Sequence, residues 1–310
     1  MFVKSFSNRA ISIGLLIAAM LITGCRNAGF RDPIAKFQSA ASVVIASTRL
    51  YVTELNKVER DHYIASQLSE KGQISLLELE KVQVFSPEGL QARLDAMDQL
   101  AAYGSLLAKL ANSNAPERVT AEVQGLGEAL TGLSSTVSGL THSDDADFKS
   151  AVGPVATIVG EILGLIVEKK IKDAIEKAVK QGEAPVNKLL MAIRGDMTRA
   201  YQRRQNALSL LRKTLVKEYN LEALKGPAAD PEKLRILAER VKAHEDRWEN
   251  FVKANPEEGL DAMAKAHSAL VTYAKSGQKV NDLSSLVEAM EAFATRAANI
   301  GRAIQALHAS

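Results

Sequence analysis

The chain has 310 residues, of which 46% are hydrophobic and only 5% aromatic, and its formal charge is +3 at pH 7. With so few aromatic residues, alanine and leucine have to supply most of the core, and this composition favours packed helices over a β-sandwich. A nearly neutral chain lacks the positive field that attracts nucleic acid, so we expect no nucleic-acid partner.

The first 24 residues form a predicted secretory signal peptide. Lys4 and Arg9 precede the apolar run ISIGLLIAAMLI, and the small residues Thr23 and Gly24 follow it. The run is too short for a transmembrane helix, which needs about 20 apolar residues. Removal of residues 1–24 takes away both cations, so the formal charge falls from +3 to +1.

Cys25 is the single cysteine of the chain and ends the motif Ile22-Thr23-Gly24-Cys25. This motif resembles the lipobox of bacterial lipoproteins: an aliphatic residue, a small residue, Gly or Ala, and an obligatory Cys. The resemblance covers only the signal region. It implies that Cys25 receives a diacylglyceryl group and becomes the first mature residue, with an amino group open to acylation. The alternative is an incidental cysteine behind an ordinary signal peptide.

Arg26 follows the cysteine. In the lipoprotein family an Asp at this position favours the inner membrane, so Arg26 implies the outer membrane, with the protein facing the periplasm or the exterior. A single acyl chain anchors marginally and two anchor stably, at about 0.8 kcal/mol per buried CH₂. A lipidated Cys25 leaves no thiol for disulfides, metal binding or catalysis. We expect residues 25–32 to be a short linker and residues 33–310 to form a single all-α domain.

The first predicted helix covers residues 33–70. Asp32 and Pro33 predict its start, as a capping residue and a proline in the first turn. The helix has roughly 38 residues and a length of about 55 Å. Its apolar residues recur at steps of three and four, the period of helices that pack lengthwise. This seam comprises Ile34, Phe37, Ala41, Val44, Thr48, Tyr51, Leu55, Val58, His62 and Ala65.

A repeated start signal predicts further helices. A capping side chain, a proline and a carboxylate occur together in Ser86-Pro87-Glu88, Asp230-Pro231-Glu232 and Asn255-Pro256-Glu257, and more loosely in Ala115-Pro116-Glu117. They predict helices over about 87–112, 116–140, 231–254 and 256–276, and a seam predicts a last helix over about 282–308. The segment between the first two helices is ambiguous between helix and a short extended piece. The expected fold is an elongated bundle of long antiparallel helices with coiled-coil-like packing.

Residues 151–167 are apolar on every side except at Thr157 and Glu161. Such a helix is either a central core helix or a membrane segment. About 17 residues give about 25 Å, less than the hydrocarbon core of about 30 Å. Long helices around an apolar segment also resemble the architecture of α-helical pore-forming toxins. That likeness implies a membrane-active protein as an alternative function.

A charged pair is predicted from helical register. If residues 146–181 and 184–219 form an antiparallel hairpin that turns at Gly182, the positions that face each other sum to about 365. Glu161 and Arg204 satisfy this sum, and each interrupts an otherwise apolar face. We therefore expect a buried ion pair between them, because buried charges are tolerated when they are paired.

No sequence motif indicates an enzyme, a metal site or a cofactor other than the lipid on Cys25. The five histidines form no metal signature, and we expect the seam residues His62 and His267 to be core imidazoles. One basic stripe, within an arc of about 80°, is either a solvated face or a docking surface for anionic lipid or an acidic partner. The stripe comprises Lys188, Arg199, Arg203, Lys213 and Lys217. We expect the protein to act by binding or scaffolding, with another envelope protein, the cell wall or the membrane as its partner.

Overall fold

The computed structural model describes residues 28–70, 72–112 and 171–309, with the isolated positions 124–125, 128–129, 132 and 165. Six long helices pack together in this part of the chain, and it contains no strand, so the all-α prediction is confirmed. The helices are α2 (Ala28–Glu70), α4 (Pro87–Asn112), α7 (Ile171–Ala223), α8 (Pro231–Lys253), α9 (Pro256–Lys275) and α10 (Val280–Ala309), with the short helix α3 (Leu76–Lys81) and a 3₁₀ turn at Gly226–Ala228.

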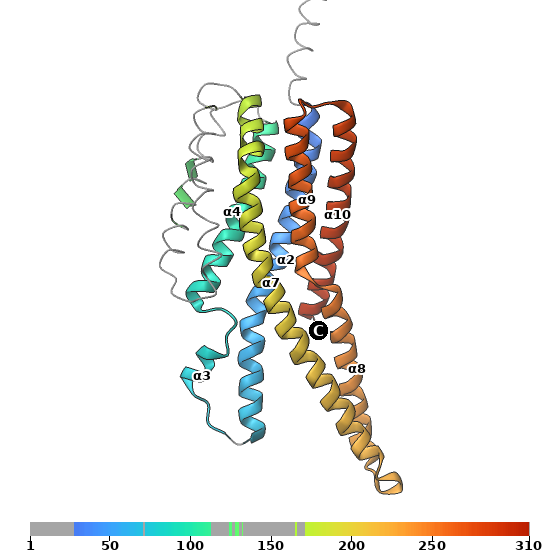
Figure 1. The fold of residues 1–310 in the computed structure, drawn as a ribbon. Coiled ribbons are helices and arrows are strands. Elements are labelled where there is room, and N and C mark those ends of the chain that lie inside the picture. The colour runs from blue at the N-terminus through green and yellow to red at the C-terminus, as the bar shows by residue number, and fades with distance from the viewer. Residues whose placement is uncertain are drawn as a thin grey trace, which may run out of the picture.

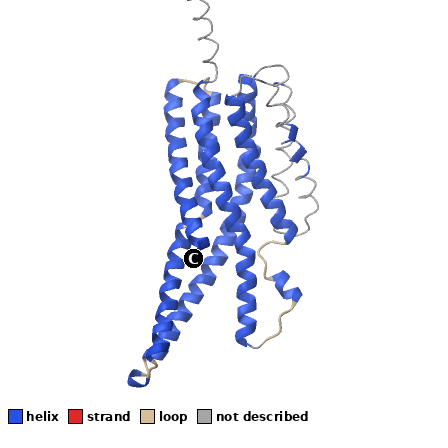
Figure 2. Cartoon of the chain, turned by 180° about the vertical axis from the view of Figure 1, so that it is seen from behind, coloured by secondary structure: helices blue, strands red, loops and turns tan. Residues whose placement is uncertain are grey.

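The helices run along one long axis (Figure 1). Helix α2 contacts α4, α9 and α10, while α7 packs against α4, α8 and α9. The starts of α2 and α7 and the turn between α9 and α10 lie at one end of the bundle. The connection between α7 and α8 lies at the opposite end and projects past the other helices (Figures 1 and 2). The molecule therefore has two different ends.

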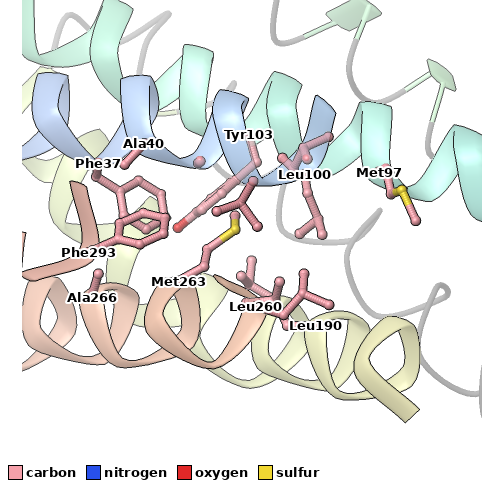
Figure 3. Close-up of a cluster of buried hydrophobic side chains, with 14 of the residues drawn as sticks. Phe37, Ala40, Met97, Leu100, Tyr103, Leu190, Leu260, Met263, Ala266 and Phe293 are labelled. Carbon is pink, nitrogen blue, oxygen red and sulfur yellow. The ribbon is translucent and has the colours of Figure 1, made fainter. Parts of the chain in front are cut away.

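The core is a continuous seam of buried side chains. In the central part of the core these side chains come from every long helix except α8 (Figure 3). The rings of Phe37 of α2 and Phe293 of α10 pack against each other at an interplanar angle of 46°, with 5.8 Å between their centroids. Tyr103 of α4 and Met263 of α9 fill the space beside them. The predicted seam of α2 is buried from Ile34 to Leu55, as the three-and-four spacing requires. A few aromatic residues and methionines thus complete a core that consists mainly of alanine and branched aliphatic residues.

The predicted starts of three helices are confirmed by their caps. The Ser86 hydroxyl accepts a hydrogen bond from the Gly89 amide at 3.0 Å. The Asp230 carboxylate accepts from the amides of Glu232 and Lys233, and the Asn255 side chain accepts from the Glu257 amide. These contacts satisfy amides that have no partner inside their own helix. Helices α4, α8 and α9 therefore begin where the local sequence predicts.

Two predicted boundaries are wrong. Helix α2 begins at Ala28 and contains Pro33, so Asp32 is not its cap. Helix α7 runs without a break through Gly182 and Pro185, so the predicted hairpin turn does not exist. At Gly182 a Cβ atom would lie 2.7 Å from the Tyr103 hydroxyl oxygen, so this glycine allows close packing of α7 on α4.

The continuous α7 removes the basis for pairing Glu161 with Arg204. That register depended on a turn at Gly182, and residues 171–181 share one helix with Arg204 instead. Glu161 and the rest of 151–164 lie outside the described residues, as does the predicted helix over 116–140 apart from isolated positions. Arg204 is half-buried and lies close enough to Tyr51 to influence its ionisation. The ambiguous segment forms α3 and then continues without a strand over residues 82–86.

Candidate functional site

Cys25, the predicted lipidation site, lies outside the described residues and three positions before the start of α2. Three residues of chain span no more than about 11 Å. An anchor on Cys25 is therefore tied to the end of the bundle where α2 begins. This is the end opposite the α7–α8 connection (Figure 1).

The predicted basic stripe occupies three separate environments along α7. Lys188 is exposed on the side of the bundle. Arg199 and Arg203 line a cavity between α7, α4 and the segment that follows α3. Lys213 and Lys217 line a groove near the far end of the molecule. The five residues all belong to α7, but they lie in different surroundings and do not form one continuous charged surface.

The cavity has a volume of about 400 Å³ and a buried ion pair in its wall. Arg93 of α4 donates from Nε to Oδ2 of Asp196 at 2.6 Å, and both side chains are at most 2% exposed. Arg93 Nη1 also donates to the Gly89 carbonyl oxygen at 2.9 Å, and the guanidinium lies 4.4 Å from the centre of the Phe85 ring. Arg199 donates to the other oxygen of Asp196 at 2.5 Å.

Burial raises the pKa of Asp196, and its contacts with the guanidinium groups of Arg93 and Arg199 oppose that shift. The sequence prediction missed this pair, although both residues interrupt apolar helix faces. Asp196 stands beside the buried Met197 of α7, and Arg93 stands beside the buried Ala92 of α4. The two residues are 103 positions apart, so no local spacing connects them.

The segment over the cavity is held by Asn56 of α2. The Asn56 side chain accepts hydrogen bonds from the amides of Val84 and Phe85 and donates to the Phe85 carbonyl oxygen at 2.8 Å. Arg203 donates to the Val82 carbonyl oxygen at 3.1 Å and lies 3.6 Å from the Glu59 carboxylate. The charges of the cavity thus bind one another and the backbone, an arrangement that joins α2, α4 and α7.

His267 of α9 is a core imidazole, as predicted. It is fully buried, and its Nε2 donates to the Tyr103 hydroxyl at 2.9 Å, while that hydroxyl donates to the Ala178 carbonyl oxygen at 3.2 Å. Its Nδ1 has no hydrogen-bond partner within the described part of the chain. Burial lowers the pKa of His267 to about 4, with a small opposing influence from Glu183. The side chain of His62 lies outside the described residues.

A shallow hollow of about 500 Å³, here called the groove, lies between exposed side chains of the last four turns of α7 and of Leu224 just after them. Three of the residues that line it are cations, and no carboxylate is among them. Arg212 pairs with Glu245 of α8 at 2.6 Å, whereas no described carboxylate pairs with Lys213 or Lys217. The lining comprises Ser209, Arg212, Lys213, Val216, Lys217, Asn220, Leu221 and Leu224.

In the described residues, no group of three or more His, Cys, Asp or Glu side chains is arranged to hold a metal ion. None of the helices described is long and apolar enough to cross a bilayer.

Comparison with known proteins finds no family model, no curated protein and no solved structure that matches this chain.

Proposed function

We propose that this protein is a lipoprotein of the bacterial cell envelope, anchored in the outer membrane through lipid on Cys25, and that its helical bundle acts as a binding or scaffolding module. The observation that carries the proposal is the motif Ile22-Thr23-Gly24-Cys25 behind an apolar run and two basic residues. The proposal includes no catalytic step and no cofactor other than the covalent lipid. Its partner is another envelope protein or the cell wall.

The geometry of the bundle supports a spacer role under this proposal. Helix α7 starts at the same end as α2 and has 53 residues, which gives it a length of about 80 Å. An anchor close to the start of α2 would hold that end at the membrane. The α7–α8 connection would then stand tens of ångströms from the bilayer, where it reaches partners that are not in the same membrane.

Replacing Cys25 by serine tests the anchor. The variant is expected to leave the membrane fraction almost completely, because serine cannot form the thioether that carries the lipid. Fractionation followed by immunoblotting measures the distribution, and mass spectrometry of the wild-type N-terminus detects the acyl groups. The helical circular dichroism of the variant should match that of the wild type, since Cys25 precedes the bundle. A wild-type N-terminus that carries no lipid would contradict the proposal.

A second candidate function is membrane activity through residues 151–167. The observation that favours it is the apolar sequence of this segment, which lies outside the described residues apart from Leu165. A membrane-active protein should release dye from vesicles that contain anionic lipid. Ile162→Asp should then abolish the leakage, because a second carboxylate in the apolar run opposes insertion by about 2.5–3.5 kcal/mol. Ile162→Val is the matched control, and intact vesicles with the wild type would exclude this candidate.

A further inference from the structure

Residues 205–245, here called the arm, comprise the end of α7, the connection and the first part of α8, and they project past the other helices (Figures 1 and 2). The two helices of the arm bury Leu208, Leu215 and Leu237 between them. His244 Nε2 donates to the Leu208 carbonyl oxygen at 2.9 Å. These contacts make the arm a fixed extension of the bundle.

The tip of the arm is closed by a buried carboxylate. Glu222 accepts hydrogen bonds from Lys225 and Lys233, each at 2.8 Å, and from the Asp230 amide at 3.3 Å. The bond from Lys225, followed by the bond from Lys233, lowers the pKa of Glu222 to about 2. Glu222 therefore stays ionised at neutral pH and keeps the two helices joined. The surface on the outside of the arm has a defined shape.

The face of α7 that points away from α8 is apolar and uncovered. Leu224 is 82% exposed, Leu210 64% and Leu221 55%. Clustered exposed apolar side chains on a soluble surface mark binding sites, whereas scattered ones do not. Leu221 and Leu224 line the groove together with Lys213 and Lys217. Leu210 precedes Leu221 by 11 residues, or about three turns, and so lies on the same side of α7. The face therefore combines apolar contact area with two cations that have no described anionic partner.

We propose that this groove binds an amphipathic helix of a partner protein, whose apolar ridge is flanked by Asp or Glu side chains. An exposed apolar face of one helix packs against the apolar ridge of another, with the side chains of each helix lying between those of the other. Acidic flanks would meet Lys213 and Lys217, which the groove itself leaves without a carboxylate. A second copy of the same face would bring these lysines together, so charge disfavours self-association.

The choice of a protein helix over a lipid surface rests on the proposed function. With the lipid on Cys25, the groove lies at the end of the molecule that is farthest from the anchoring membrane. The partner is therefore expected to be a protein that stands away from that membrane.

Site-specific photocrosslinking in the native cell tests the inference. The full chain carries p-benzoylphenylalanine in place of Leu221, and the control carries it in place of Met191, which is 69% exposed on the same helix but outside the groove. Mass spectrometry then identifies the crosslinked peptide. We expect Leu221 to crosslink about tenfold more than Met191. The captured peptide should carry apolar residues at three-and-four spacing with acidic residues beside them.

Charge variants distinguish a contact made by the lysines of the groove from an effect of the net charge of the protein. Lys213→Glu with Lys217→Glu should lower the crosslink about tenfold, because attraction becomes repulsion. Lys213→Arg with Lys217→Arg should retain it. Lys188→Glu with Lys242→Glu makes the same change of net charge at exposed positions outside the groove and should have little effect.

Each other result overturns the inference. Crosslinks to a second copy of this chain would make the groove a self-association surface, and crosslinks to lipid would make it a membrane contact. Equal crosslinking from Leu221 and Met191, or a captured peptide without acidic flanks, would also contradict it. Fractionation of the same cells reports on the anchor separately, so loss of anchoring and loss of partner binding are distinguished.

Discussion

Replacing Asp196 by alanine is expected to lower the free energy of unfolding by about 3–5 kcal/mol. The substitution leaves the Arg93 guanidinium buried, at 1% exposure, without its carboxylate partner. A buried charge without compensation costs far more than a lost surface contact. The change removes the Arg93–Asp196 pair, which links α4 to α7, and also the contact between Asp196 and Arg199 within α7.

Equilibrium unfolding in urea, followed by circular dichroism, measures this loss. The matched control is Asp261→Ala, because Asp261 pairs with Arg194 of the same helix α7 at 2.7 Å but both side chains are more than 40% exposed. An exposed pair contributes at most about 1 kcal/mol. Arg93→Met combined with Asp196→Leu should recover most of the stability, since no charge is then buried. Equal losses for Asp196→Ala and Asp261→Ala would contradict the assigned role of the buried pair.

The sequence predicts helices well where two independent local signals agree. Helices α4, α8 and α9 combine a capping residue and a proline at the start with a clear apolar face, and all three begin as predicted. The end of α9 also follows the sequence, since Gly277 adopts a φ of +76° just beyond its last turn. Such signals act within a few residues, so they can be recognised without the tertiary structure.

Glycine and proline mislead the prediction where tertiary packing decides their role. Gly182 is interpreted as a turn, but it lies in a helix and makes room for Tyr103. Pro185 costs α7 a backbone hydrogen bond, and the burial of the neighbouring Val186 and Leu189 helps to offset that cost. The local sequence does not show which surface a small residue faces. A glycine that ends a helix and a glycine that allows two helices to pack closely therefore cannot be distinguished from the sequence alone.

The candidate sites show the same difference between what local sequence signals predict and what tertiary packing decides. The helical period puts the five basic residues at similar angles around α7, but it does not reveal what lies beside each of them. Arg203 donates to the segment fixed by Asn56 although its side chain stays 47% exposed, whereas Lys213 and Lys217 line the groove at the far end of α7. The pair of Arg93 and Asp196 depends on two helices far apart in the chain. Only the assembled bundle brings such residues together.

Stability is expected to fall as the pH drops from 6.5 to 4, partly through His267. Burial places the pKa of this imidazole at about 4 in the folded protein, below the ordinary value of 6.5. Between these values the unfolded chain binds a proton that the folded chain does not, so acid favours unfolding. The contribution is fully present above pH 6.5 and is lost towards pH 4. It amounts to about 3 kcal/mol in total, at 1.36 kcal/mol per pKa unit.

Comparing the wild type with His267→Leu isolates this contribution. Carboxylates also titrate in this pH range, but their effect on stability is the same in the wild type and the variant. Urea unfolding at intervals between pH 4 and pH 7 should show a smaller loss of stability for the variant, by up to about 3 kcal/mol. Tyr103→Phe removes the hydroxyl that His267 and the Ala178 carbonyl oxygen contact, so it should cost about 1–3 kcal/mol at neutral pH. It leaves the imidazole buried and should therefore keep a pH dependence like that of the wild type. The same dependence in His267→Leu would instead assign the acid sensitivity to the carboxylates.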